Sequence, residues 1–368
     1  MLLLFQTSTT VQLKSSSNSN VRSATNGHTA QSNELPFTIK DLRAAIPAQC
    51  FKPSLWRSLA YFFLDIGIIA GLLATAITLQ AWWFWPIYWF AQGTMFWALF
   101  VVGHDCGHGS FSRTKWINNL VGHLSHTPIL VPFHGWRISH RTHHANTGNL
   151  ETDESWYPVT EAKFDEMSWL EKLVRFYVPL LAYPIYLFRR SPSRPGGSHF
   201  LPDSPLFKPS EKWDVLTSTG WLIAMVSLLI GTGLQIGWLP LLAYYGVPYI
   251  IFVMWLDLVT YLHHTEETIP WYANADWFFL KGALSTIDRD YGIFNSIHHH
   301  IGTHVAHHIF WNIPHYHLQT ATEAIKPVLG SYYRQSTVPI WKSFLQAYRR
   351  CHFVANQGSP LYYQQVRK

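Results

Sequence analysis

Two long stretches with almost no charged side chains limit the folds open to this chain more than any other feature. No Lys or Arg lies between Arg57 and Arg113, and from residue 58 to 103 the only acidic residue is Asp65. Residues 215–256 contain no charged side chain at all. A membrane-spanning helix needs roughly 20 apolar residues. Each stretch is about twice that long, so we expect each to form a hairpin of two membrane-spanning helices.

Turn residues divide each stretch into two helices. The segments QAWWFWP (80–86) and QIGWLP (235–240) contain Pro or Gly, which end helices, and Trp, which gathers at membrane interfaces. The predicted spans are residues 58–79, 84–104, 215–236 and 240–262. Each hairpin returns the chain to its starting side, so the Lys and Arg residues fall on one face, which the positive-inside rule assigns to the cytoplasm.

The remaining segments complete an all-α integral membrane protein with two transmembrane helical hairpins and a cytoplasmic helical cap. We expect a flexible leader at residues 1–34, a membrane domain at residues 35–350 and a C-terminal tail at residues 351–368. Within the membrane domain, residues 105–213 and 264–350 form the cap. The Ser-rich leader also fits a targeting peptide. Residues 169–188 are long enough to span, but Glu171 and Lys172 near their start favour an amphipathic helix on the membrane surface.

Composition supports a membrane protein from a reducing compartment. Hydrophobic residues make up 48% of the chain and charged residues only 13%, which is about half the charged fraction of an ordinary soluble domain. The cysteines Cys50, Cys106 and Cys351 form no CxxC pair and no disulfide framework. Histidine is unusually frequent, with 21 residues against 27 Lys and Arg.

Eight histidines lie in three clusters with helical spacing. The segments HDCGH, HRTHH and HVAHH contain, in order, His104 and His108, then His140, His143 and His144, then His304, His307 and His308. Side chains three and four residues apart on a helix lie side by side, with about 5–6 Å between Cβ atoms, so two imidazoles can bind one metal ion. All three clusters fall on the predicted cytoplasmic side, where the fourth span also ends with His263 and His264.

The number of histidines favours two metal ions. Imidazole binds zinc, copper, iron and nickel, so the ligand type alone does not determine which metal is bound. A catalytic zinc takes three protein ligands, so eight or more histidines suit two ions of higher coordination number, and adjacent pairs such as His143–His144 fit bare metal better than haem. We therefore expect a histidine-rich di-iron site. A non-enzymatic metal carrier is the alternative, but it should place histidines within the spans, and the first and third spans contain none.

The text around the clusters resembles a known family. The clusters, the hairpins, and the segments GHLSHTPILVPFHGWRISHRTHH (122–144) and LSTIDRDYGIFNSIHHHIGTHVAHHIFWNIPHYHL (284–318) resemble the membrane fatty acid desaturases, most closely the omega-3 (delta-15) acyl-lipid desaturases of cyanobacteria and plastids. The likeness begins near Pro36 and runs to the C-terminus. The family's ligand pattern falls on the eight clustered histidines, and its additional ligand falls on His264. At His300 the chain departs from the pattern, where an Asp is expected.

This resemblance implies a reaction and its partners. Two iron ions, O2 and two electrons would insert a cis double bond at the omega-3 position of linoleoyl-type chains in membrane glycerolipids. Ferredoxin would be the electron donor, since the chain has no cytochrome b5-like HPGG segment and no GxGxxG fingerprint. The membrane would be a cyanobacterial thylakoid or plasma membrane, or a plastid membrane, with the clusters on the cytoplasmic side, and we expect no nucleic-acid partner. A delta-12 desaturase, an acyl hydroxylase or a carotenoid oxygenase would share the same clusters.

Three further residues stand out near the predicted site. Asp257 and His264 are seven residues apart on one face of the fourth span, so Asp257 either orients His264 or only caps the interface. Asp65 is an acid inside a span, which is functional by default, but no role can be assigned to it from the sequence. His298 is expected at the periphery of the site.

Overall fold

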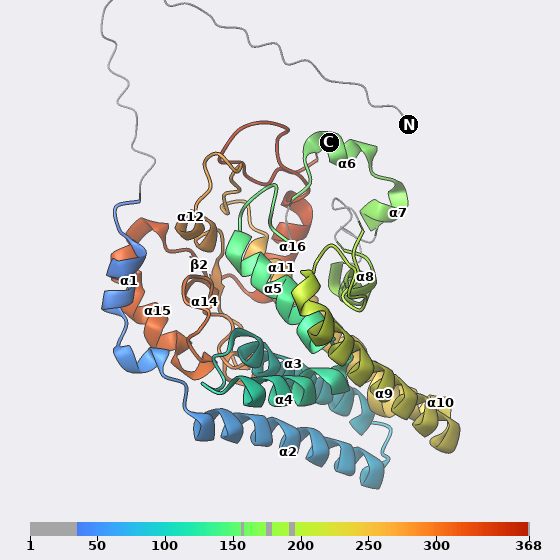
Figure 1. The fold of residues 1–368 in the computed structure, drawn as a ribbon. Helices are drawn as coiled ribbons and strands as arrows, with labels where there is room; N and C mark the ends of the chain where they lie inside the picture. Colours follow the sequence, from blue (N-terminus) through green and yellow to red (C-terminus); the bar gives the residue numbers. More distant parts are fainter. Residues whose placement is uncertain (1–34, 156–157, 174–178, 191–195, 367–368) are drawn as a thin grey trace, which may run out of the picture. The chain divides into compact units, whose positions relative to one another are not determined.

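Four long helices carry the architecture of the described part of the chain, which in this computed structural model comprises residues 35–155, 158–173, 179–190 and 196–366. They are α2 (Leu55–Leu79), α3 (Phe84–His108), α9 (Lys212–Ile236) and α11 (Val247–His264). Residues 37–368 cluster as one unit. Within it, α3 packs against α2, α11 and the shorter α4 (Lys115–His126) (Figure 1). The predicted leader lies outside the described residues.

Shorter elements connect and cap these helices. The remaining α-helices are α1 (Ile39–Ala45), α5 (Phe133–Asn146), α6 (Glu161–Glu166), α7 (Trp169–Lys172), α8 (Tyr183–Phe188), α10 (Trp238–Leu241), α12 (Phe279–Ala283), α13 (Phe294–Ile297), α14 (His304–Ile309), α15 (His315–Leu329) and α16 (Ile340–Arg350). Single turns lie at η1 (Ala48–Phe51), η2 (Thr127–Ile129), η4 (Pro179–Leu181), η5 (Pro209–Glu211), η6 (Leu242–Gly246) and η7 (Gly330–Tyr332). The two-residue strands β1 (Asp288–Arg289) and β2 (Gln335–Ser336) pair in parallel, with Asp288 opposite Gln335.

Three helical stretches among the described residues are long and apolar enough to cross a membrane. They run from Leu55 to Leu79, from Pro209 to Ile236 and from Trp238 to His264, and they contain the first, third and fourth predicted spans. The second predicted span falls in α3, which has 25 residues but is not among the three. Polar residues such as Gln92, Thr94 and Asp105 interrupt the apolar sequence of α3. The second predicted span, and with it the total of four spans, therefore stays a prediction.

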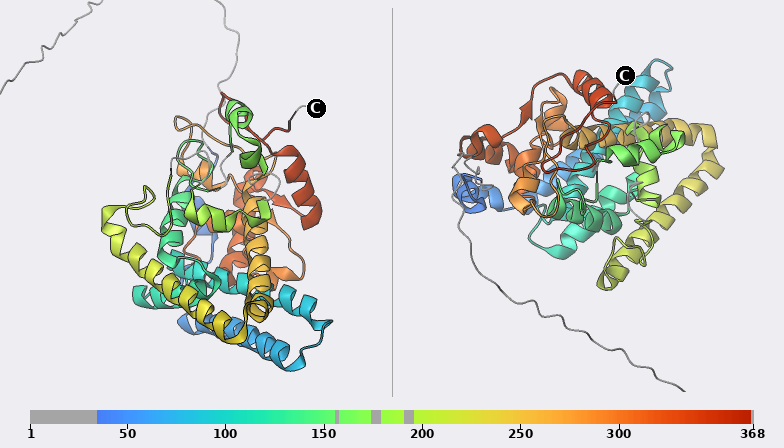
Figure 2. Two further views of the ribbon diagram at one scale, coloured as in Figure 1. Left: turned by 90° about the vertical axis from the view of Figure 1, so that its right-hand side faces the viewer. Right: turned by 90° about the horizontal axis from the view of Figure 1, so that it is seen from above.

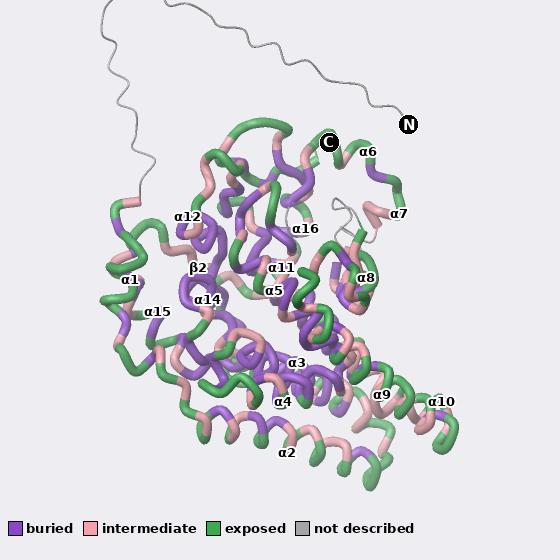
Figure 3. Tube along the Cα trace, in the orientation of Figure 1, coloured by how far each residue is buried: buried purple, intermediate pink, exposed green. Residues whose placement is uncertain are grey.

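Burial separates α3 from α2, α9 and α10. Every residue of α3 from Gln92 to Cys106 is buried by neighbouring helices, whereas α2, α9 and α10 are mostly half-buried or exposed (Figure 3). Their exposed side chains include large apolar ones such as Phe63, Ile223 and Leu234. The blue α2 and the olive α9 project on the side away from α6 and α16 (Figures 1 and 2). Extended apolar surface of this kind marks an interaction surface, here one suited to lipid.

Two segments of the cap differ from their predicted form. Residues 169–188 are not one amphipathic helix: their described parts are α7, the turn η4 and α8. Pro179 and Pro184 lack the N–H that a continuous helix needs, so the chain turns inward and buries Tyr183. The expected tail pairs with the cap, because Val354 bridges to Thr160 and Leu361 to Trp271.

Candidate metal centre

Nine histidines meet where four helices approach one another. One group contains His104, His108, His140, His144 and His307, and a second contains His143, His264 and His308; within each group the ligand nitrogens lie within 4.8 Å of one another. His304 lies beside the second group, with its Nε2 3.0 Å from the Nε2 atoms of both His264 and His308. The structure therefore brings together all eight clustered histidines and His264.

Helix geometry explains why paired histidines serve different groups. The last turns of α3 and α5, the end of α11 and the whole of α14 supply the nine rings. With 3.6 residues per turn, adjacent side chains on a helix point about 100° apart. His143 and His144 therefore face different groups, and so do His307 and His308. The HH pairs allow α5 and α14 to line both groups at once.

The spacing of the ring nitrogens fits metal ligation. The Nε2 atoms of His143 and His264 are 3.3 Å apart, those of His140 and His144 are 3.1 Å apart, and those of His144 and His307 are 3.2 Å apart. Metal–nitrogen bonds of about 2.1 Å place neighbouring ligand nitrogens roughly 3.0–3.4 Å apart. An all-imidazole donor set of this spacing suits iron, zinc, copper or nickel.

Burial keeps these rings in the form that binds metal. Removal from water, followed by the nearby histidines, lowers the pKa of His140, His144, His307 and His308 well below the usual value for histidine. The rings are therefore neutral at physiological pH. A neutral imidazole offers the lone pair that a metal ion needs.

Two outer partners hold rings of the second group. The Nδ1 atom of His143 lies 2.6 Å from Oδ1 of the buried Asp153, and Nδ1 of His308 lies 3.1 Å from the hydroxyl of Thr147. Asp153 is itself fixed, because its Oδ2 accepts from the backbone N–H of Gly148. Metal-binding histidines usually donate their second ring N–H to such partners. Sequence analysis missed Asp153 and Thr147; their only signal is that they follow the HRTHH cluster.

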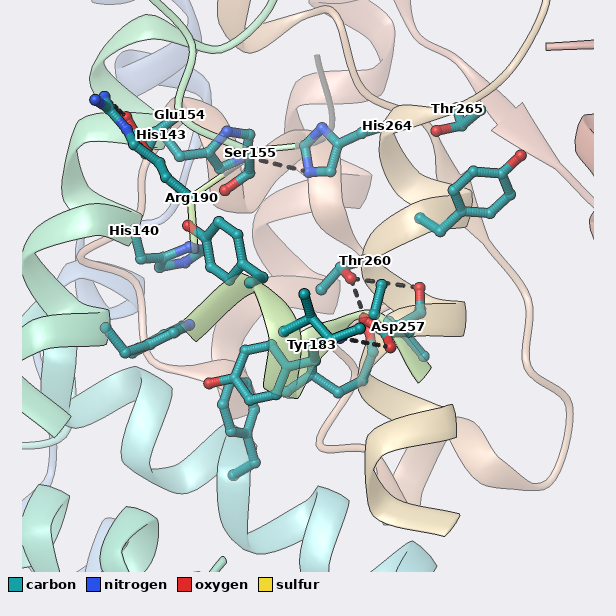
Figure 4. A pocket seen from close by; sticks show the side chains of 18 of the residues that line it. His140, His143, Glu154, Ser155, Tyr183, Arg190, Asp257, Thr260, His264 and Thr265 are labelled. Atoms are coloured by element: carbon teal, nitrogen blue, oxygen red, sulfur yellow. Dashed lines mark hydrogen bonds and ion pairs between the residues drawn. The ribbon is translucent and has the colours of Figure 1, made fainter. Parts of the chain in front are cut away.

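A cavity of about 320 Å³ adjoins both groups. Its histidine side includes His104, His140, His143, His264 and His304, and its apolar walls include Trp97, Phe100, Leu256 and Ile301. Figure 4 shows His140, His143 and His264 on one side, with Tyr183 and Asp257 on another. The bidentate pair of Arg190 and Glu154, together with Ser155, adds polar groups. The cavity can hold a long apolar chain against the histidines.

Comparison with known proteins assigns the chain to a family. The fatty acid desaturase family model matches residues 46–338. The chain belongs to the fatty acid desaturase family. This desaturase is 68% identical over 334 residues to an sn-1 acyl-lipid omega-3 desaturase (ferredoxin) of Synechocystis sp., covering 91% of this chain and 93% of that protein.

Two further relatives carry similar names. An sn-1 acyl-lipid omega-3 desaturase (ferredoxin) of Nostoc sp. is 65% identical to this desaturase over 335 residues, covering 91% of this chain and 93% of the relative. A chloroplastic sn-2 acyl-lipid omega-3 desaturase (ferredoxin) of Helianthus annuus is 54% identical over 339 residues, covering 89% of this chain and 76% of the relative.

The structure of this desaturase distinguishes the two adjacent histidines at the end of α11. His263 uses both ring nitrogens elsewhere: Nδ1 lies 2.7 Å from the carbonyl oxygen of Ile287, and Nε2 lies 3.1 Å from the hydroxyl of Tyr291. His264 points instead into the second group. His298, expected at the periphery, is buried beside Trp255 and belongs to neither group.

Asp257 does not orient His264. Its Oδ2 accepts the backbone N–H of Tyr183, 3.1 Å away, at the start of α8. The hypothesis that Asp257 orients His264 is therefore wrong. The carboxylate joins α11 to α8 along one wall of the cavity, a long-range contact that the spacing along α11 cannot reveal.

Proposed function

We propose that this chain is an omega-3 acyl-lipid desaturase. It inserts a cis double bond at the omega-3 (delta-15) position of linoleoyl-type chains in membrane glycerolipids, with two iron ions, O2 and electrons from ferredoxin. The observation that carries the proposal is the pair of imidazole groups on one side of a 320 Å³ cavity with apolar walls. The names of the relatives support the omega-3 position, the acyl-lipid substrate and the donor.

The two groups would each hold one iron. His104, His108, His140, His144 and His307 would bind the first, and His143, His264, His304 and His308 the second. When bound, this iron pair supplies the O2 chemistry that removes two hydrogens from neighbouring methylenes. Asp153 and Thr147 each bond Nδ1 of their histidine, so they would leave Nε2 of His143 and His308 free to hold the iron.

The cavity walls would deliver the acyl chain and exclude water. Trp97, Phe100, Leu256 and Ile301 give the cavity largely apolar walls, so methylenes that leave the equally apolar bilayer core meet little polar surface there. The hydrogen bond from the backbone N–H of Tyr183 to Asp257 holds α8 against α11 along the path of the acyl chain. Regiospecificity would follow from where these walls stop the chain relative to the histidines.

The proposed setting is a membrane crossed four times, with the histidines on the cytoplasmic side. Three apolar stretches and the 25-residue α3 support four spans. The membrane would be a cyanobacterial thylakoid or plasma membrane, with a plastid membrane as the alternative. Ferredoxin is a small acidic protein, and the net charge of +6 suits its docking.

Reconstitution of the purified chain in lipid vesicles tests this function. Vesicles that contain linoleoyl lipid should form a product with one more double bond only when O2 and reduced ferredoxin are both supplied. Omission of either should leave the lipid unchanged. Formation of a hydroxylated chain as the main product would favour the acyl hydroxylase alternative. A carotenoid product with unchanged acyl chains would favour the oxygenase alternative.

A further inference from the structure

A carboxylate–histidine contact outside both metal groups ties α2 to the loop before α14. Oδ2 of Asp65 lies 2.7 Å from Nε2 of His299, and both side chains are buried. Neither residue belongs to a metal group. Asp65 is the acid within a span that sequence analysis left without a role, and α2 contributes no histidine to the centre.

The loop held by this pair has an unfavourable backbone. His299 has φ 49° and His300 has φ 56°, the left-handed region that only a few per cent of residues other than Gly adopt, with Asn, Asp and His the most frequent among them. Immediately beyond them, Ile301 lines the cavity and His304 lies against the second group. A loop in this conformation needs an external contact to keep it there, and Asp65 supplies one.

A second carboxylate–histidine pair continues the contact to the first group. Oδ2 of Asp105 accepts from the backbone N–H of His315 at 3.0 Å and lies 2.9 Å from Nδ1 of the same residue. Asp105 directly follows His104, a member of the first group. The rings of His299 and His315 are 4.7 Å apart, and the ring of Tyr61 meets both edge-on. Asp65, His299, His315 and Asp105 therefore form one connected, buried set of side chains.

We propose that Asp65, His299, His315 and Asp105 form a positioning brace for the metal centre. Asp65 acts through His299 on the loop that leads into α14 and its first residue, His304, and Asp105 acts on His104 and on the start of α15. One end of the brace therefore serves the second group and the other end serves the first. The brace rests on the proposed di-iron centre and deepens it, because it assigns α2 a part in holding the ligands.

Release of iron to a ferrous chelator tests the brace without measuring desaturation. The purified, anaerobically iron-loaded protein should lose its two irons in two phases. Asp65→Leu should speed one phase about tenfold, the effect typical of lost outer partners, and leave the other at the parental rate. Asp105→Leu should speed the other phase. Asp65→Asn should stay close to the parent, because its amide oxygen still accepts from Nε2 of His299.

Two further variants serve as a substitute for Asp65→Leu and as a matched control. If Asp65→Leu fails to fold, His299→Asn tolerates the positive φ but is too short to reach Asp65, so it should speed the same single phase. Asp257→Asn is the matched control: it alters an equally buried acid that contacts Tyr183 rather than the brace, so both phases should stay parental.

Two results would overturn the brace alone. One is release of both irons at parental rates from Asp65→Leu and His299→Asn. The other is equal acceleration of both phases together with a lower unfolding midpoint, since that marks a general structural role. A parent protein that binds no iron would instead remove the di-iron proposal on which the brace rests.

Discussion

His307→Ala and His308→Ala are each expected to abolish desaturation, and each should lower the iron content from about two per chain to about one. His307 belongs to the first group and His308 to the second, so each variant removes a buried nitrogen ligand from a different ion. Both rings are buried, and the apolar helices do not depend on them, so membrane insertion should persist. Elemental analysis of anaerobically purified protein and lipid analysis of an expressing host measure the two effects.

His263→Asn is the control for this prediction. His263 is buried and adjacent to His264, but both its ring nitrogens bond to Ile287 and Tyr291. Its replacement should keep about two irons per chain. Desaturation that persists in His307→Ala or His308→Ala, or one zinc and no iron in the parent, would contradict the assignment of the two groups.

Thr260→Trp is expected to stop turnover while leaving the iron in place. Thr260 lines the cavity one helical turn before His264, so an indole there would occupy the space in which the acyl chain must lie. Among the described residues its hydroxyl bonds only within α11, to Leu256 and Asp257, so the exchange removes no described hydrogen bond between helices. Overpacking of this kind costs about 1–3 kcal/mol, which a membrane protein of this size should survive.

Ile250→Trp is the matched control on the same helix. Ile250 is 44% exposed on α11, so an indole there should face lipid and leave both turnover and iron unchanged. Iron content is measured together with product formation in both variants. This distinguishes a blocked cavity from the loss of an iron ligand. Normal turnover in Thr260→Trp would mean that the substrate does not use this cavity.

Local patterns in the sequence predicted which histidines come together, because the spacing of side chains is a property of single helices. Side chains three and four residues apart on one helix must lie together, so the three clusters were visible before the structure. The division between the groups follows from the roughly 100° turn per residue, but only the packing of α5 against α14 shows which of His143 and His144 faces which group. Asp153 could not be chosen, because a loop and not a periodic element brings it to His143.

Contacts between distant segments account for what the sequence could not predict. Asp257 shares a helix face with His264, yet its partner is Tyr183, 74 residues away in the sequence. Asp65 stood out as a buried acid, but its partner His299 lies 234 residues further on. The charge-free stretches predicted three of the apolar helices well, since length and hydropathy are local. The burial of α3 reflects how its neighbours pack around it.

The position of the new double bond tests the central claim most directly. Separate cultures of a host that lacks polyunsaturated fatty acids, expressing this chain with ferredoxin, would be fed linoleate or oleate, and double bonds would be located by mass spectrometry of derivatised esters. The account predicts conversion of linoleate to alpha-linolenate with little change in oleate. Conversion of oleate to linoleate as the main activity would contradict it and make the chain a delta-12 desaturase.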